Sequence, residues 1–202
     1  MNVVKEVAKT KDEALRQVLV KLNANEEEVS YYFEEIKGGL FKGVTYECSG
    51  FLKMDVIAEV QEYLKKILNG MNLDVSFEVN TKDDVTTIKM YSSNNPVIIG
   101  KNGQNLEALT VLARQFIRNI TINGPRIILD VEDYKDRQIK KLERLARNLA
   151  RDVVRTKVDI EMDNMNSYER RIVHNILSDF KGVKTESKGE EPNRHVVIKY
   201  DK

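Results

Sequence analysis

The sequence predicts an α+β protein built from three small domains. Its 202 residues suit one large domain or two to three small ones. An apolar fraction of 41% is enough for ordinary folded cores, and a charged fraction of 32% supplies a well-solvated surface. Helical and strand-like patterns follow one another in short segments separated by Gly-, Asn- and Pro-containing turns. We expect the domains to span residues 1–50, 51–134 and 135–202.

The first 50 residues predict a small α/β unit. Three stretches alternate as β-strands do: Asn2–Ala8, Glu26–Phe33 and Val44–Glu47. Thr10 is suited to cap a helix between the first two of these strands. The glycine-rich segment 38–43 predicts a turn, and Cys48–Gly50 is the expected boundary with the next domain.

Residues 51–134 predict the order helix, strand, strand, helix, Gly-x-x-Gly loop, helix, strand. An apolar stripe indicates the first helix from Asp55 to about Leu68. Three strands are expected: Asp74–Val79, Val85–Tyr91 and Arg126–Val131. The helix after the loop should bury one apolar side, made of Leu106, Leu109, Leu112, Ala113 and Phe116.

Positive charge collects in a predicted helix at residues 135–157. This segment has nine basic and three acidic side chains, whereas residues 1–90 have 12 basic and 16 acidic ones. Its expected apolar side consists of Ile139, Leu142, Ala146, Leu149 and Val153. The opposite side carries Arg137, Lys141, Arg144, Arg151 and Arg155. Such a face could meet a polyanion, although charge runs are more often plain solvated surface.

The segment Gly100-Lys101-Asn102-Gly103 lies between two predicted helices. Its glycines allow tight backbone turns and let another backbone approach closely. The N-terminus of the following helix favours anions, and Lys101 adds a full charge. A P-loop would need a longer spacing and a Ser or Thr after Gly-Lys, and a dinucleotide fingerprint would need three glycines. Both of these enzyme sites are therefore excluded.

The run Ile98–Leu106, IIGKNGQNL, resembles the Gly-x-x-Gly motif of a prokaryotic-type (type II) KH domain. The resemblance implies a clamp on the backbone of about four nucleotides of single-stranded nucleic acid, with bases in a shallow apolar groove beside it. The clamp would consist of Gly100, Lys101, Asn102 and Gly103. Gln104 and Asn105 could donate to phosphates or simply cap the helix, and Arg114 and Arg118 could extend a basic edge or be solvated.

The third domain contains an Arg-x-x-x-His helix. Asn166 and Glu169 have the spacing of a capping box at the start of a helix at 168–180. Arg170 and His174 are four residues apart, so they should share one exposed face that suits a phosphate. An ordinary surface pair is the alternative. The accompanying strands are expected at Val158–Met162, Val183–Ser187 and His195–Tyr200.

Residues 165–174 and 185–194 together resemble the R-three-H domain, a family that binds single-stranded nucleic acid. Besides Arg170 and His174, the resemblance implies a polar rim made of Thr185, Ser187, Lys188 and Arg194. A KH domain followed directly by an R-three-H domain resembles the bacterial Jag family, which is associated with the SpoIIIJ-type membrane insertase. Gly39–Gly43 is similar to the turn around a Phe in that family's N-terminal domain, although relatives often carry more lysine there and a longer linker after it.

The Jag resemblance implies a non-enzymatic RNA-binding protein of the bacterial cytoplasm. It would regulate transcripts linked to the cell envelope, elongation or sporulation. The implied partners are single-stranded RNA or DNA, a small stand-alone KH protein and the insertase. The apolar helices of the chain also allow a homodimer. The alternative is a protein-interaction adaptor that docks the insertase through residues 1–50.

Further expectations follow from what the sequence lacks. A nuclease would need clustered carboxylates for a metal, or a nucleophile beside a base, and neither pattern occurs. We therefore expect no catalytic residue, metal or cofactor. The single Cys48 cannot form an internal disulfide, which predicts a reducing compartment. No stretch approaches the roughly 20 apolar residues of a membrane span.

Overall fold

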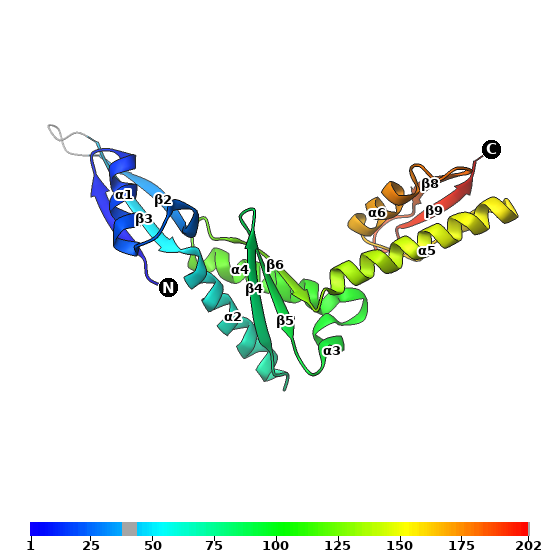
Figure 1. Ribbon diagram of the computed structural model, residues 1–202, viewed down its shortest axis with the longest axis horizontal. Helices are drawn as coiled ribbons and strands as arrows, with labels where there is room; N and C mark the ends of the chain where they lie inside the picture. Colours follow the sequence, from blue (N-terminus) through cyan, green and yellow to red (C-terminus); the bar gives the residue numbers. More distant parts are fainter. Residues whose placement is uncertain (38–43, 202) are drawn as a thin grey trace. The chain divides into compact units, whose positions relative to one another are not determined.

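The computed structural model describes residues 1–37 and 44–201 and consists of two compact units (Figure 1). The N-terminal unit is Met1–Glu132, and the C-terminal unit is Asp133–Lys202. Helices pack on three three-stranded sheets, two in the first unit and one in the second. This arrangement confirms the α+β class. The expected glycine-rich turn at 38–43 lies outside the described residues.

The first sheet belongs to residues 1–52. Its elements are β1 (Val4–Ala8), α1 (Lys11–Leu22), η1 (Glu26–Glu28), β2 (Val29–Ile36) and β3 (Thr45–Leu52). The strand order is β1-β3-β2, antiparallel throughout. Thr10 caps α1 as expected, because its side chain accepts from the backbone N–H of Glu13 at 3.3 Å. Ala14 and Val18 of α1 are fully buried against the sheet.

Strand β3 leads directly into α2 (Lys53–Gly70), the helix that precedes the second sheet. The expected boundary at Cys48–Gly50 lies within β3, where all three residues are buried. A Cβ at Gly50 would lie 2.5 Å from Cγ1 of Val18, so only glycine lets α1 pack this closely on the strand. The strand continues to Leu52, and α2 begins at Lys53. No linker residue separates β3 from α2.

The second sheet follows the predicted order of elements. They are α2 (Lys53–Gly70), β4 (Ser76–Lys82), β5 (Val85–Tyr91), α3 (Asn95–Ile99), η2 (Lys101–Gly103), α4 (Gln104–Ile120) and β6 (Arg126–Val131). The sheet order is β4-β5-β6, with β6 parallel to β5 at one edge. Leu112 was expected in the buried face of α4 but is 43% exposed, because the buried stripe contains Ala113 and leaves its neighbour outside.

The C-terminal unit packs two helices on a third sheet. Its elements are α5 (Tyr134–Thr156), β7 (Ile160–Glu161), α6 (Ser167–Leu177), β8 (Val183–Lys188) and β9 (His195–Tyr200). The sheet order is β7-β9-β8, antiparallel. Ala146, Ala150 and Val153 of α5 are fully buried in a core shared with α6 and β9. The predicted apolar side of α5 is thus confirmed, and Ile139, at its N-terminal end, is half-buried.

The described residues contain no helix that is both long enough and apolar enough to cross a membrane.

Candidate nucleic-acid interface

The Gly-x-x-Gly loop has positive φ angles at both of its glycines, a conformation that glycine adopts more easily than other residues. Gly100 has φ 73° and ψ −179°, and Gly103 has φ 81° and ψ 8°. A Cβ at Gly100 would lie 2.6 Å from Cγ of Asn105. Between the glycines, Asn102 also has a positive φ of 53°, which asparagine tolerates better than most residues. Lys101 and Asn102 are exposed at the tip of the loop.

The side chain of Asn105 contacts Val97 and lies beside Gly100, and so supports the loop. Its Nδ2 donates to the backbone carbonyl of Val97 at 2.8 Å, which joins the start of α4 to α3. The same side chain fills the space beside Gly100. Of the two expected phosphate donors, Asn105 therefore uses its side-chain amide in a hydrogen bond to α3, which precedes the loop. Gln104 is exposed and precedes it in the first turn of α4.

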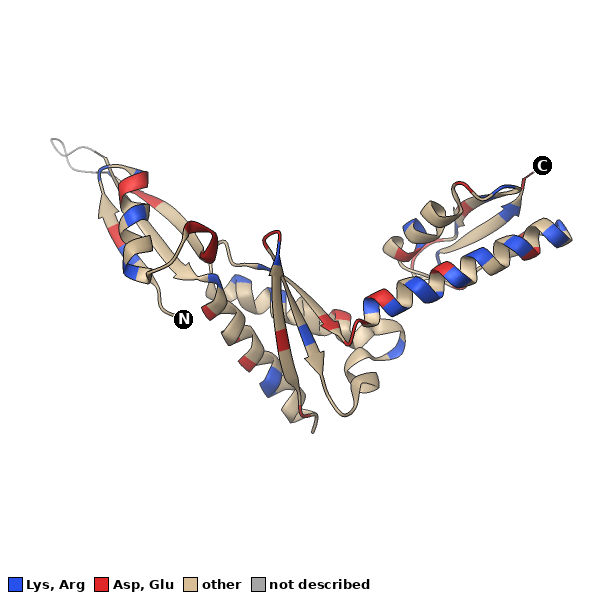
Figure 2. Ribbon diagram, viewed as in Figure 1, with Lys and Arg blue, Asp and Glu red and all other residues tan. Residues whose placement is uncertain are grey.

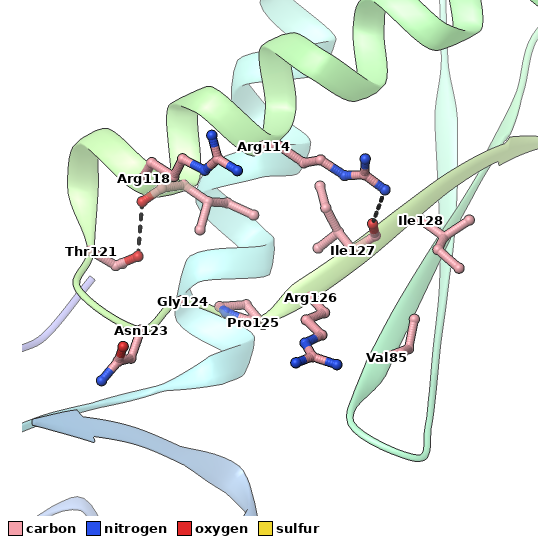
Figure 3. Close-up of a pocket in the computed structure, with 11 residues that line it drawn as sticks. Val85, Arg114, Arg118, Thr121, Asn123, Gly124, Pro125, Arg126, Ile127 and Ile128 are labelled. Carbon is pink, nitrogen blue, oxygen red and sulfur yellow. Dashed lines mark hydrogen bonds between the residues drawn. The ribbon is translucent and has the colours of Figure 1, made fainter.

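A cavity of about 590 Å³ opens between α4 and the edge strand β6 (Figure 3). Three guanidinium groups line it, those of Arg114 and Arg118 from α4 and that of Arg126 from the start of β6. Arg114 donates to the carbonyl of Ile127 at 3.4 Å. Ile117 and Ile128 contribute apolar surface. We call this cavity the arginine groove.

The arginine groove lies far along α4 from the loop. Gln104 and Arg118 are 14 residues apart in one helix, which corresponds to about 21 Å of helix axis. Sequence reasoning had singled out Arg114 and Arg118 but missed Arg126. No spacing rule connects a helix to the first residue of a later strand, and Arg126 reaches the groove because β6 packs against α4.

Arg170 departs from the expected exposed position. Only 7% of this residue is exposed. Its Nη1 donates to the carbonyl of Met165 at 2.8 Å and pairs with Oε1 of Glu191 at 2.9 Å. The guanidinium therefore joins the segment before α6 to the segment between β8 and β9. The predicted capping box is confirmed, because Asn166 and Glu169 exchange hydrogen bonds at the start of α6.

His174 is also turned toward its own domain. Its Nδ1 lies 2.6 Å from Oγ1 of Thr185, and its Nε2 lies 2.9 Å from Oγ of Ser187. Burial, together with the positive charge of Arg170, lowers the pKa of His174 below its usual value. A neutral imidazole held between two hydroxyls results. Thr185 and Ser187 thus lie beside His174, as the sequence predicted.

The other two predicted rim residues, Lys188 and Arg194, have different contacts from those of Thr185 and Ser187. Successive residues of a strand point to opposite faces, so Lys188 lies on the face opposite to Ser187. Its Nζ pairs with Oε1 of Glu161 at 2.7 Å, and that hydrogen bond and charge raise the pKa of Lys188. Arg194 is exposed, and its backbone carbonyl accepts from the N–H of Met165 at 3.0 Å. Arg194 therefore lies in the segment joined to the Arg170 contacts, and Lys188 does not face His174.

Basic residues recur along the whole of α5 (Figure 2). The five expected cations are all exposed: Arg137, Lys141, Arg144, Arg151 and Arg155. Within the described ranges, no group of three or more His, Cys, Asp or Glu side chains is placed to hold a metal ion.

Two families match the chain, the KH domain at residues 59–137 and the R-three-H domain at residues 140–200. The RNA-binding protein KhpB of Clostridium symbiosum is 33% identical over 98% of this chain and 91% of its own length. The chain belongs to the KhpB (Jag) family. The KhpB of Bacillus subtilis is 28% identical over 94% of both chains. That of Lactiplantibacillus plantarum is 30% identical over 68% of this chain, which is 42% of its own length. KhpB membership confirms the resemblance to the Jag family.

Proposed function

We propose that this protein binds single-stranded RNA and that the Gly100–Gly103 loop is its primary clamp. The loop geometry carries the proposal. The positive φ angles of Gly100 and Gly103 turn the backbone tightly and leave Lys101 and Asn102 exposed at the tip, where an RNA backbone can reach them. The 17 residues of α4 follow at once and direct the positive end of the helix dipole toward a bound phosphate. The relatives named KhpB are RNA-binding proteins, which supports the same class of ligand.

The arginine groove would bind the part of the RNA strand that continues beyond the loop. A single-stranded RNA has phosphates for the guanidinium groups and exposed bases for the apolar floor. Arg114, Arg118 and Arg126 supply the first kind of contact, and Ile117 and Ile128 supply the second. Because the groove and the loop share α4, one strand could contact both.

The second module would act through residues that Arg170 and His174 position. Nη1 of Arg170 and both ring nitrogens of His174 are directed to partners within the domain. We therefore assign them the role of holding β8 and the segment around Glu191 and Arg194 in place. Exposed Arg194 would then meet the RNA. Two weak sites on one chain raise the effective affinity for a long strand.

The proposal extends to organisation and cellular role. We propose three domains, with the first two joined where β3 meets α2, a position two residues beyond the expected one. The protein would act without catalysis in the bacterial cytoplasm, as a post-transcriptional regulator of transcripts linked to envelope, elongation or sporulation. A small stand-alone KH protein, a SpoIIIJ-type insertase and a second copy of the chain are the partners to be tested.

One observation favours the adaptor function as a second candidate. Val7 of β1 and Ile36 of β2 are 49% and 41% exposed. Their strand register places both on the sheet face opposite to Cys48, which packs against α1. Replacing both by Ser in the full chain should abolish recruitment of a protein partner if this face docks one. RNA affinity should not change.

The test of RNA binding is fluorescence anisotropy with labelled random single-stranded RNA and DNA at low and moderate salt. The variant Lys101→Asp/Asn102→Asp places negative charge against phosphate and should abolish binding, while circular dichroism stays native. The matched control Lys66→Asp/Asn69→Asp makes the same charge change at exposed positions of α2 and should retain affinity. Unchanged affinity in the folded loop variant would overturn the proposal.

A further inference from the structure

One face of α5 carries a continuous row of cations, which we call the basic stripe. Its members are Arg137, Lys140, Lys141, Arg144, Arg147, Arg151 and Arg155, all of them exposed. At about 100° per residue they fall in one sector about 120° wide, opposite to the buried alanines of the helix. From its first member to its last, the sector extends over about 27 Å of helix axis. Figure 2 shows that Lys and Arg residues recur along the length of α5.

Most of this charge is not neutralised within the protein. Arg155 pairs with Asp152 at 2.7 Å, and Arg151 donates to Oδ1 of Asn148 and to the carbonyl of Arg147. Across residues 1–37 and 44–201, no carboxylate pairs with the other five side chains of the stripe. A row of uncompensated cations on a rigid helix attracts a polyanion strongly, because binding releases the counterions of that polyanion.

A membrane surface is the less suitable polyanion. An amphipathic helix that binds lipid inserts its apolar face between the headgroups. The apolar face of α5 is occupied, since Ala146, Ala150 and Val153 are fully buried in the core of their own unit. The free face carries the cations, with Leu145 and Val154 exposed singly at its two flanks.

Two features separate double-stranded from single-stranded RNA as the ligand. Sites for single strands combine cations with aromatic side chains on which bases stack, whereas the single aromatic residue of α5, Tyr134, is half-buried at the N-terminal end and hydrogen-bonded to Gln138. A double helix offers a regular array of phosphates and is recognised through shape and backbone contacts. We propose that the basic stripe binds the phosphate backbone of a double-stranded RNA segment. This inference rests on the proposed RNA-binding function and adds a second class of RNA to it.

The test uses the full chain and three RNAs: a blunt duplex of about 16 base pairs, a single strand of equal length, and the duplex with a single-stranded tail. The variant Lys141→Gln/Arg144→Gln/Arg147→Gln removes three charges and keeps good helix formers. Its affinity for the duplex should fall at least about tenfold, and the slope of log affinity against log salt should decrease by about 2 to 3. Its affinity for the single strand should change much less.

The matched control is Lys65→Gln/Lys66→Gln/Lys181→Gln, which removes three exposed charges elsewhere. It should bind all three RNAs as the wild type does. Equal losses for duplex and single strand in the α5 variant would overturn the inference, as would a wild type that does not bind the duplex. Binding to phosphatidylserine vesicles that the α5 variant loses, without a loss for the duplex, would assign the stripe to membranes instead.

The two proposals can fail separately. The loop variant Lys101→Asp/Asn102→Asp should lose the single strand and keep the blunt duplex. A wild type that binds only the duplex would refute the proposed single-strand function and leave the stripe as a duplex site. One that binds only the single strand would refute the stripe alone.

Discussion

Asn105 donates its side-chain N–H to the carbonyl of Val97, 2.8 Å away, and fills the space beside Gly100. This contact fixes the loop against the helix that follows it. Asn105 therefore has a positioning role, whereas its neighbour Gln104 is exposed and could touch RNA directly. Loss of either side chain should weaken RNA binding, but only the loss of Asn105 should also disturb the loop.

Asn105→Ala should weaken RNA binding by about threefold to tenfold, because a lost hydrogen bond costs about 0.5–1.5 kcal/mol and the loop is then no longer held in place. The same variant should broaden the amide NMR signals of the loop. Gln104→Ala is the comparison. If Gln104→Ala weakens binding more while Asn105→Ala leaves both affinity and loop signals unchanged, the positioning role is wrong.

Arg126→Gln should reduce the affinity for single-stranded RNA and flatten its salt dependence. Each phosphate contact contributes about 0.7 to the slope for a single strand, so the slope should fall by about that amount. Anisotropy titrations from low to moderate salt measure it. Arg16→Gln removes an exposed guanidinium from α1 and should leave the slope intact. An unchanged slope for Arg126→Gln would remove the arginine groove from the interface.

Arg170→Ala should destabilise the C-terminal unit by about 1–3 kcal/mol, because it leaves the Met165 carbonyl and Glu191 without their buried donor. Urea unfolding measures this change. Glu191→Gln should cost less than about 1 kcal/mol, since the Glu191 side chain is 61% exposed and its amide oxygen still accepts. A wild-type unfolding midpoint for Arg170→Ala would show that the buried contacts do not matter.

His174 should make the C-terminal unit less stable at acid pH. Its pKa in the folded state is lowered, so the unfolded chain takes up a proton first as the pH falls. The stability from neutral His174 is complete above the unfolded pKa of about 6.5 and is lost as the pH falls toward the folded pKa. Urea unfolding at about pH 7.5 and about pH 5.5 should show this loss. In His174→Gln the free energy of unfolding should differ less between the two pH values. A difference equal to that of the wild type would show that His174 is not the group responsible.

Local sequence signals predicted the regular elements well. Helix α5 was expected at 135–157 and spans Tyr134–Thr156, because its apolar period is unbroken along the whole helix. The capping box at Asn166 and Glu169 and the cap at Thr10 are equally local, since donor and acceptor lie within three residues. Such features depend little on the rest of the chain.

The features that were missed depend on distant parts of the chain. The orientation of Arg170 is set by Glu191, 21 residues away, so helical spacing alone could not show that its face is covered. Arg126 reaches the arginine groove because β6 packs against α4 in the folded domain. Gly50 looked like a linker residue, yet it is buried against Val18, where a small residue is needed for close packing. The positions of Arg170, Arg126 and Gly50 are all set by tertiary packing, which local sequence patterns do not show.

The central claim is that RNA contacts the Gly100–Gly103 loop, and NMR of the isotope-labelled full chain tests it most directly. A short single-stranded RNA would be titrated in while the backbone amide signals are followed. The account predicts that the largest shifts fall on Gly100 to Gly103 and the first turn of α4, with smaller ones along the arginine groove. Saturating RNA binding that leaves the loop amides unshifted would contradict it.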